Sequence, residues 1–348
     1  MCHRVLLLAM IFTSASSGCS GCLSSPPEGI EEDPCNQDER PADERDDPIA
    51  FSALQHFERC NGPVLRDDEN DDDSHYETAS DGHVFIDEQG RLSMVYSGDV
   101  GGHIAPKFAR GSDWDSWERL GPMMATAKEG DVDLFRETPF YRLAEDGTHQ
   151  LFYIGYADEK EYKSQIYLAE SNTIEGPYVR TGEPVIKRGM QAQRDVYLMT
   201  SPSVVSHEGE LFMVYLAWNN NPDKVSEVWV MAATSSDDGR TWSDIREVDV
   251  PVGMEGQITP GPDGFYYATS LSEYDRTEAI YLARAPHPLG PYEKLPEPVL
   301  IKEGKPWEVH ESNAPQIVFD ETTRTAYLYY VGASYLFGWW TLLAQARY

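Results

Sequence analysis

Beyond residue 50 the chain alternates short hydrophobic and polar runs, and Gly, Asp and Asn interrupt these runs at close intervals. Alternation with a period of two is typical of β-strands that bury one face, whereas a helix repeats its apolar residues every three or four positions. No long stretch carries the helical period. The pattern therefore predicts an all-β domain over residues 50–348.

One strand pair recurs along this domain: an apolar strand, a turn and a Tyr-rich strand. A third strand with small residues and a polar outer segment follow each pair, except that the last unit ends after its third strand. Five such units, repeated every roughly fifty to sixty residues, predict a five-bladed β-propeller. The pairs occupy residues 83–98, 139–157, 202–218, 259–273 (a shortened copy) and 315–334.

The missing outer strand of the last unit has a counterpart at the other end of the domain. Residues 57–66 read "FERCNGPVLR" and match the outer segments of the other units, although they precede the first strand pair. We therefore expect an N-terminal strand to complete the last blade. Closure of this kind leaves no long sheet edge open.

Two turn motifs fit the same frame. The phrase Gly-Pro-Tyr, followed by a polar stretch and Pro-Val, occurs at residues 176–178 and again at 290–292, where each third strand passes into its outer segment. Residues 235–242 read "SSDDGRTW" and match the Asp-box of sialidase-type propellers. Asp and Gly favour the turn and Trp packs between blades, so a structural role is expected for the Asp-box.

The first 49 residues follow a different pattern. Arg4 precedes an apolar run over residues 5–12, and small residues then lead to "SSGCSGC". This is the order of an export signal, and the run is too short to span a bilayer. Residues 16–19 resemble a bacterial lipobox, which implies a lipoprotein-type signal over residues 1–18 and a lipid on Cys19. Ser16 stands where Leu is usual, Cys22 is a second candidate, and a plain secretory signal is the alternative.

The charge of the chain narrows the range of partners. Residues 19–49 are acidic and Pro-rich, which predicts a tether, and the formal net charge is -31. Nucleic acid and anionic membrane surfaces are excluded as partners, because phosphate binding requires clusters of Lys and Arg. A lipid anchor is then the only membrane contact expected. The acidic stretch over residues 66–77 is read as solvated rather than as a calcium loop, because it lacks the regular ligand spacing and the turn Gly.

The cysteines fit a protein outside the cytoplasm, either anchored to the cell envelope or periplasmic or extracellular. Cys2 lies in the signal, and Cys19 or Cys22 would carry lipid. Cys35 and Cys60 remain as a candidate disulfide in an oxidising compartment.

The domain resembles a known family of enzymes. Inner strands that begin with an acid near Pro, and turns that read Ser-x-x-x-x-Gly-Pro-Tyr, are similar to the five-bladed propeller glycosidases of glycoside hydrolase family 43 and the related families 32 and 130. The resemblance covers about residues 50–348. It implies a glycoside hydrolase that acts on poly- or oligosaccharides and needs no cofactor.

The inner strands of a propeller begin at one mouth of its central channel. Aligned on the Pro near each start, the five segments read "SDGHVF", "RETPFY", "MTSPSV", "QITPGP" and "ESNAPQ". Glycoside hydrolysis requires two carboxyl groups, one protonated and one ionised. Three of the five segments supply an acid: Asp81, Glu137 and Glu311.

The resemblance implies roles for these acids. "DGHVF" resembles the first-blade motif Asp-Pro-His-Val, which implies that Asp81 is the general base or nucleophile, although Gly82 replaces Pro. "FRETP" resembles both the Arg-Asp-Pro stabilising motif and the Glu-Cys-Pro acid motif of family 32, so Glu137 is a candidate for either role. Arg136 beside it is a candidate for substrate binding.

The third blade departs from the family pattern, because Thr200 stands where the general acid is implied. Glu137, Glu311 or Asp195, on a loop over the mouth, could replace it. Alternatively the chain has lost catalysis and is a glycan-binding propeller, or a scaffold that contacts another protein. The fold alone does not distinguish these functions.

The other candidate substrate-binding residues lie near strand ends or in loops. Trp218 and Trp307 could stack on sugar rings, as could Trp114 and Trp117, with packing between blades as the alternative. His83 and His310 could gather at the channel with His103. A cation beside these histidines would need a paired ligand motif, which the sequence lacks, so no metal site is predicted and calcium stays an alternative.

Overall fold

The computed structural model describes residues 49–66, 77–158, 162–191, 196–219, 227–252, 255–271, 279–334 and 338–348, with Glu77 and Glu311 described only in their backbone. These residues form β-strands, turns and one short 3-10 helix, η2 (Phe51–Gln55). The all-β prediction is confirmed. Within the described ranges no helix is long and apolar enough to cross a membrane.

The first three blades are antiparallel sheets of four consecutive strands. Blade one contains β2 (Glu77–Ile86), β3 (Leu92–Asp99), β4 (Ile104–Asp113) and β5 (Ser116–Pro122). Blade two contains β6 (Phe135–Leu143), β7 (His149–Tyr156), β8 (Gln165–Ser171) and β9 (Val179–Arg180). Blade three contains β10 (Leu198–His207), β11 (Glu210–Asn219), β12 (Glu227–Ser235) and β13 (Ser243–Glu247).

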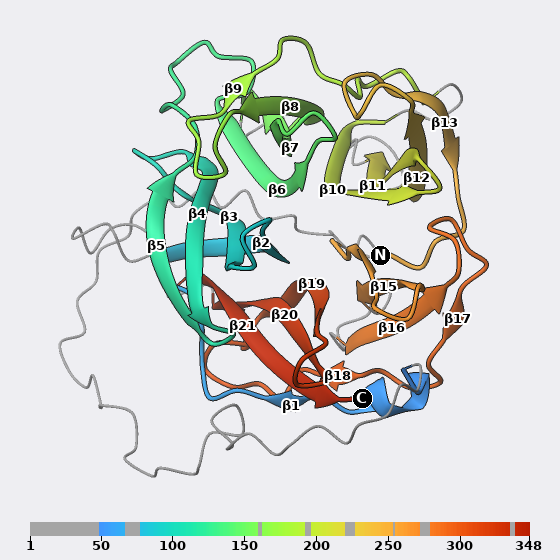
Figure 1. Ribbon diagram of the computed structural model, residues 1–348. Coiled ribbons are helices and arrows are strands. Elements are labelled where there is room, and N and C mark those ends of the chain that lie inside the picture. The colour runs from blue at the N-terminus through green and yellow to red at the C-terminus, as the bar shows by residue number, and fades with distance from the viewer. Residues whose placement is uncertain are drawn as a thin grey trace, which may run out of the picture.

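The last two blades complete a ring around a common centre (Figure 1). Blade four has a short inner strand and a divided outer strand. Its elements are β14 (Ile258–Pro260), β15 (Tyr266–Leu271), β16 (Ala279–Ala285), β17 (Glu293–Lys294) and β18 (Leu300–Ile301). Blade five contains β19 (Glu311–Asp320), β20 (Thr325–Ser334) and β21 (Gly338–Arg347).

The outer strand of blade five comes from the N-terminal end of the domain, as predicted. Strand β1 (Glu58–Arg59) pairs antiparallel with β21, with Glu58 opposite Gln345 and Arg59 opposite Ala344. In Figure 1 the blue N-terminal segment follows the edge of the red blade. The start of β21 also pairs with the start of β2 in parallel, which joins blades five and one into one continuous sheet.

The described residues form five apolar clusters, each between two neighbouring blades. Strand β7 shows how the period of two produces them: Leu151 and Tyr153 face blade one, whereas Phe152 and Ile154 face blade three. Alternate side chains of a strand point to opposite faces, so a strand buried on both faces contributes to two clusters. Each such side chain contributes about 1.5–3 kcal/mol through burial.

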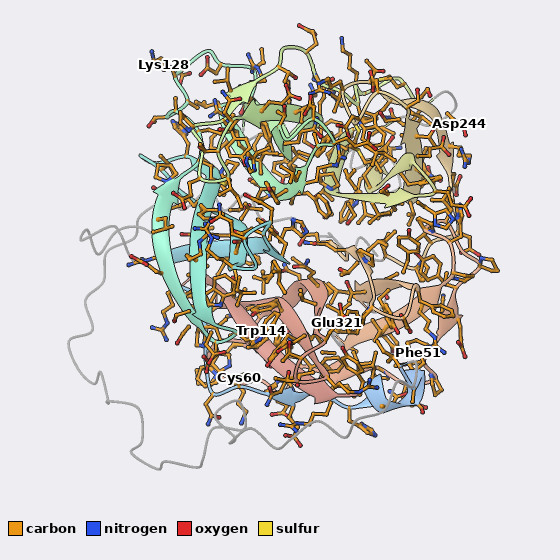
Figure 2. The ribbon with its side chains drawn as sticks, in the orientation of Figure 1. Phe51, Cys60, Trp114, Lys128, Asp244 and Glu321 are labelled. Carbon is orange, nitrogen blue, oxygen red and sulfur yellow. The ribbon has the colours of Figure 1, made fainter. Side chains whose placement is uncertain are left out.

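Aromatic side chains extend this packing to the outer turns. Figure 2 shows how densely side chains fill the space between the ribbons, and it labels Trp114, which lies between β4 and β5. Its ring stacks on Tyr327 of blade five with 4.2 Å between centroids. Trp117 donates its Nε1 hydrogen to the carbonyl oxygen of Trp114 at 3.1 Å. These two residues therefore serve the contact between blades one and five.

The recurring Gly-Pro-Tyr phrase builds the same turn twice. In both copies the Gly has a left-handed φ, 91° and 89°, and the Gly-Pro bond is cis. The hydroxyls of Tyr178 and Tyr292 each donate to the carbonyl oxygen four residues earlier, at 3.0 and 2.8 Å. A side chain at Gly176 would also approach the carbonyl oxygen of Met123 to 2.6 Å. The repeat in the sequence thus reflects a repeated local structure.

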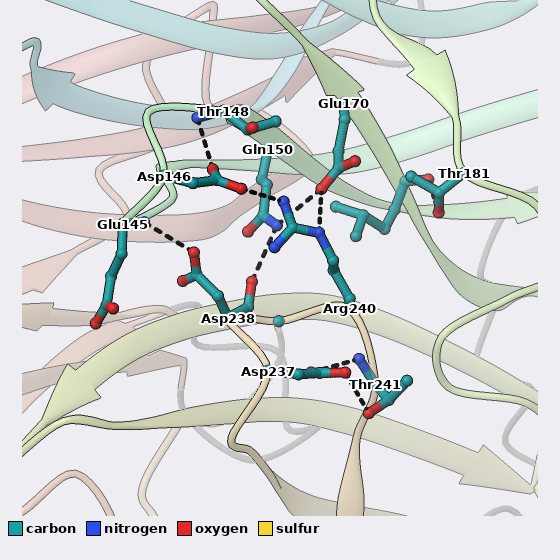
Figure 3. Close-up of polar contacts among 12 residues, drawn as sticks. Glu145, Asp146, Thr148, Gln150, Glu170, Thr181, Asp237, Asp238, Arg240 and Thr241 are labelled. Carbon is teal, nitrogen blue, oxygen red and sulfur yellow. Dashed lines mark hydrogen bonds and ion pairs between the residues drawn. The ribbon is translucent and has the colours of Figure 1, made fainter.

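The Asp-box fastens blade three to blade two (Figure 3). Inside the turn, Asp237 accepts hydrogen bonds from the amide and hydroxyl of Thr241. Across the blades, the Arg142 guanidinium donates to Asp238 at 2.6 Å, and Arg240 forms an ion pair with Asp146 at 2.8 Å. The motif has the structural role that was predicted for it.

The predictions for the N-terminal region fall mainly on residues 1–48, which lie outside the described residues. They comprise the signal, the tether, lipidation at Cys19 or Cys22, and the part played by Cys35. Cys60 is buried and disulfide-bonded.

Candidate active site

Five residues, four in inner strands and one shortly before the inner strand of blade four, share an uncommon backbone conformation near the centre of the ring. They have φ angles between 45° and 58°, in the left-handed region that residues other than Gly rarely adopt. In blades one, two, three and five a register shift in the pairing with the second strand coincides with this residue. All five line one small cavity with a volume of about 10 Å³, together with Pro139, Pro202 and Gln257. The five, called here the ring residues, are Asp81, Thr138, Ser201, Glu255 and Ala314.

The ring residue of blade four corrects the sequence alignment. That alignment used Pro260 as the marker of the strand start, but Pro260 pairs with Tyr266 at the hairpin end of β14. Glu255 holds the position equivalent to Asp81. The sequence contains a weaker indication that Asp81 and Glu255 are equivalent. "DGHV" in blade one and "EGQI" in blade four both consist of an acid, a Gly, a polar residue and an aliphatic residue in that order.

Hydrogen bonds between inner strands hold the ring together. Gln316 of blade five exchanges two hydrogen bonds with the backbone of Val84 in blade one, at 2.6 and 2.9 Å. Gln257 of blade four donates from Nε2 to the carbonyl oxygen of Gly82 in blade one, at 3.1 Å. These bonds connect blades through their innermost strands, so they fix the positions of the residues around the cavity.

Asp81 lies half-buried in the cavity wall. Ser80 donates a hydrogen bond to its Oδ2 at 3.0 Å, and Ser97 donates a second. Protein atoms surround the carboxyl group although part of its surface faces the cavity. Burial therefore raises the pKa of Asp81, and the two serine hydroxyls oppose this effect without cancelling it. A carboxyl group with a raised pKa is a stronger base than an exposed Asp.

Glu137 is held by two tyrosines. Tyr156 donates to its Oε1, and Tyr162 donates to its Oε2 at 2.8 Å. Arg136, the sequence neighbour that could have paired with Glu137, instead forms a buried ion pair with Asp133 at 3.1 Å. Hydrogen bonds donated to both oxygens favour the ionised form of the Glu137 carboxylate.

The Tyr162 hydroxyl is buried beside Glu137 and experiences the charge of two further acids. Burial raises its pKa well above 10, and the negative charges of Glu137, Glu255 and Asp81 raise it further. The hydroxyl therefore stays protonated and remains a donor. Of these acids Glu137 contacts the hydroxyl directly, and Glu255 and Asp81 act on it only through their charge.

Blade three brings hydroxyl groups to this centre. Thr200 and Ser201 are both buried, and their side-chain oxygens lie 3.2 Å apart. Their blade is the one in which the family resemblance implies a general acid. The departure read from the sequence at Thr200 is therefore present in the structure.

The predicted substrate-binding residues lie elsewhere. His83 is 8% exposed, stacks on Phe140 at 3.9 Å between centroids, and accepts a hydrogen bond from the amide of Tyr141 at 3.0 Å. Burial lowers the pKa of His83 to about 3, so the ring is neutral and serves the contact between blades one and two. Trp218 is 1% exposed and belongs to the apolar cluster of blades three and four.

The remaining candidates also lie outside the lining of this cavity. Trp307 packs against the apolar cluster of blades four and five, and the carbonyl oxygen of His310 accepts a hydrogen bond from Lys302. These two residues, like Arg136, His83 and Trp218, are absent from the cavity lining. Asp195 and the side chain of Glu311 lie outside the described residues. In the described ranges no group of three or more His, Cys, Asp or Glu side chains is arranged to hold a metal ion.

The fold and the site together define a β-propeller with carboxylates gathered at its centre. Residues 110–346 match the sequence profile of Glycosyl hydrolases family 43. The match covers more than half of the chain, and the chain belongs to this family.

Solved structures share the fold. A thermostable family-43 glycoside hydrolase aligns with a TM-score of 0.59 and 16% identity over 76% of this chain and 88% of its own. An endo-arabinase from Bacteroides thetaiotaomicron aligns with a TM-score of 0.58 and 14% identity, over 83% of this chain and 98% of its own. An α-L-arabinofuranosidase from Podospora anserina, solved with cellotriose, aligns with a TM-score of 0.61 and 13% identity, over 85% of this chain and 98% of its own. No functionally curated protein matches the chain by sequence.

Proposed function

We propose that the protein hydrolyses glycosidic bonds of poly- or oligosaccharides at the cavity of the ring residues. The observation that carries this proposal is the gathering of acids at the centre of the ring: Asp81 and Glu255 line one cavity, and Glu137 directly precedes the lining residue Thr138. Hydrolysis of a glycoside requires two carboxyl groups in different protonation states beside one bond. A site with three carboxyl groups meets this requirement, and membership of the family supports it.

The surroundings of two of the acids fit different tasks. Asp81, with its raised pKa, suits the base that takes a proton from the attacking water. Glu137, with both oxygens accepting tyrosine hydrogen bonds, suits an ionised group that stabilises the positive charge developing on the sugar ring. Tyr156 and Tyr162 act as positioning residues for Glu137.

The proposal is tested by release of reducing sugar or chromophore from arabinosides, xylosides, fructosides, mannosides and galactosides. The full-length chain is compared with Asp81→Asn and with Asp249→Asn, which changes an exposed acid of blade three. We expect turnover by the wild type and by Asp249→Asn, and a loss of at least about 100-fold in Asp81→Asn. Equal turnover by all three proteins would exclude Asp81 from the reaction.

A glycan-binding protein without catalysis is the second candidate function. The buried hydroxyl pair of Thr200 and Ser201, at the blade where the family resemblance implies an acid, favours it. Calorimetric titration with oligosaccharides separates the two functions. Binding of a glycan that the protein never cleaves would support the second one.

We also propose that the protein is exported and anchored by lipid at Cys19, because the order of charged, apolar and small residues at the N-terminus fits such a signal. Mass spectrometry of the N-terminal peptide from membranes tests this. Cys19→Ser is expected to release the protein from the membrane fraction, and Cys22→Ser to leave it anchored. The reverse result would assign the lipid to Cys22.

A further inference from the structure

Blade one carries a groove at the end of its two hairpins, apart from the cavity of the ring residues. This hairpin groove has a volume of about 380 Å³ and is lined by residues 86–92, around the β2–β3 turn, and 110–114, at the end of β4. We propose that the hairpin groove is a second carbohydrate site, which binds a neutral sugar residue of a polysaccharide. The inference rests on the proposed function in one respect, namely that the ligand of the protein is a glycan.

The hairpin groove and the central cavity lie at different places along strand β2. Asp81 lines the cavity from the middle of this strand, whereas Ile86 lines the groove from its last position. A strand rises about 3.3 Å per residue, so the two residues are roughly 15 Å apart along it. The linings of the two sites share no residue. One sugar can therefore occupy the groove while another occupies the cavity.

Trp114 gives the hairpin groove an aromatic wall. Figure 2 labels this residue, which lies in the turn between β4 and β5. Tyr327 stacks on its ring with 4.2 Å between centroids and an interplanar angle of 11°, so blade five covers one face of the indole. The side chain is only half-buried, and it also borders the groove. An indole held by a second ring is a fixed surface on which the apolar face of a sugar can stack.

Arg91 and Asp113 place a hydrogen-bond donor and an acceptor in the same lining. The Arg91 side chain is 42% exposed, although its Nε and Nη2 both lie 2.9 Å from Oδ2 of Asp87. The Asp113 side chain is exposed, and its Oδ1 accepts the amide hydrogen of Trp114 at 2.7 Å. Sugar hydroxyls both donate and accept hydrogen bonds, so they can pair with both groups. Bonds to protein atoms already hold the two side chains, which lowers the entropy that a ligand must lose on binding.

The charges around the hairpin groove favour a neutral ligand. Asp87, whose side chain is completely buried, pairs with Arg91 at 2.9 Å and with Arg110 at 2.7 Å. Arg110 also pairs with the exposed Glu175 at 3.1 Å. The guanidinium charges are thus balanced within the protein, whose formal net charge is -31. An anionic sugar or a phosphate would be repelled by this net charge, whereas a neutral sugar is not.

The size of the hairpin groove fits a small ligand. Its volume lies at the lower end of the roughly 300–1,000 Å³ that small-molecule sites occupy, which is enough for one or two sugar rings. One such contact is weak, but a polymer offers many equivalent residues, and binding at a second site adds to binding at the cavity. The groove is therefore expected to hold the protein on long glycans.

The test measures retention by polysaccharides in native gels. Arabinan, arabinoxylan, galactan, galactomannan and levan are cast into separate gels, and the full-length chain carries Asp81→Asn so that the polymers stay intact. Versions that also carry Arg91→Met or Trp114→Ala are run beside it. Arg246→Met is the matched control, because Arg246 is also 42% exposed and also pairs with an acid.

We expect at least one polymer to retain the parent protein and the Arg246→Met control equally. Arg91→Met and Trp114→Ala should each raise the dissociation constant by about fivefold or more. Trp114→Phe keeps a flat ring and should recover part of the affinity that Trp114→Ala loses. Arg91→Met keeps the proposal falsifiable if Trp114→Ala fails to fold, because Arg110 still pairs with Asp87 in this variant. Thermal unfolding of every variant checks the fold.

The other outcomes would overturn the proposal. Equal retention of Arg91→Met and its parent, or retention of the parent by none of the polymers, would exclude the hairpin groove as a glycan site. Release of sugar by the wild type decides the hydrolase function separately. Retention by polygalacturonate alone would replace the neutral ligand with an anionic one. Self-association that Arg91→Met abolishes, without binding of any polymer, would identify a second copy of the chain as the occupant.

Discussion

Arg59 of strand β1 forms an ion pair with Glu308, whose side chain is completely buried, with 3.0 Å between Nε and Oε1. The hydroxyl of Tyr330, in the middle strand of blade five, donates to the same carboxylate oxygen. Arg59 also pairs with Glu303 at 3.2 Å. The strand that closes the ring is therefore held by side chains as well as by its short backbone pairing with β21.

Removal of Arg59 should destabilise the fold strongly. In Arg59→Met the Glu308 carboxylate stays buried without its cation, which costs about 3–5 kcal/mol. Urea unfolding near pH 7 measures the effect, with Arg246→Met as the control because its ion pair with Asp244 is exposed and worth at most about 1 kcal/mol. The double variant Arg59→Met with Glu308→Gln should regain much of the loss, and its failure to do so would contradict the burial argument.

Loss of the hydrogen bond that Gln257 donates across the centre of the ring should destabilise the fold. Gln257→Leu leaves the carbonyl oxygen of Gly82 without this donor, and an unsatisfied buried polar group costs about 1–3 kcal/mol. Gln257→Glu should be at least as destabilising, because an ionised carboxylate offers no hydrogen to the carbonyl. An unchanged unfolding midpoint in both variants would show that the bond contributes nothing.

Asp81 should make the protein less stable as the pH rises. Its pKa in the folded protein lies above the 3.8 of an exposed Asp, so its protonated form is favoured by folding and stability falls as the pH rises through the raised pKa. Asp81→Asn is therefore expected to raise the free energy of unfolding at pH 7. The gain should vanish below pH 3.8, where Asp81 is protonated in both states. A gain that persists there would have another origin.

Loss of the Tyr162 hydroxyl should shift the pH profile of activity. Tyr162→Phe removes one hydrogen bond to the Glu137 carboxylate, which makes that carboxylate easier to protonate. The acid limb of kcat/KM should move to higher pH, and Tyr156→Phe should shift it in the same direction. Tyr281→Phe in blade four serves as the control. Lower kcat/KM with an unmoved acid limb would mean that Tyr162 acts on substrate rather than on Glu137.

The Asp-box contact should appear as a coupling energy between blades two and three. A double-mutant cycle with Arg142→Met and Asp238→Ala is expected to give about 1–3 kcal/mol, because both side chains are largely buried and the distance is 2.6 Å. The exposed pair Lys187–Glu183 should give less than about 1 kcal/mol. Equal values for the two pairs would remove the special role assigned to the motif.

The fold could be predicted from the sequence because each blade repeats the same local rules. Alternation with period two located the strands, and Gly-Pro-Tyr marked the passage from third to outer strand in two blades. Residues 57–66 matched an outer segment because β1 and the bridge of Leu65 to Thr341 occupy an outer-strand position. Blade four was the exception, since its inner strand β14 is short and ends, rather than begins, at a Pro.

The site could be predicted only in part. Asp81 and Glu137 could be named as candidates because acids at strand starts are visible in the sequence, and their catalytic roles stay a prediction. That Glu255 lines the same cavity as Asp81 could be recognised only from the structure. His83 and Trp218 looked like ligands of a sugar because histidine and tryptophan often are. Their side chains pack between blades, and a period of two cannot show which apolar or aromatic residue faces a neighbouring blade and which reaches the centre.

The pairing of β1 with β21 has a consequence for folding kinetics. It joins residues near 58 to residues near 345, so the contact that closes the ring spans almost the entire domain in sequence. Contacts of such separation form late, because the intervening chain must first lose its freedom, and topologies rich in them fold slowly. Once formed, the same contact slows unfolding, because β1 must separate from β21 before blade five can open. Slow folding and a long native lifetime therefore have the same structural origin in this protein.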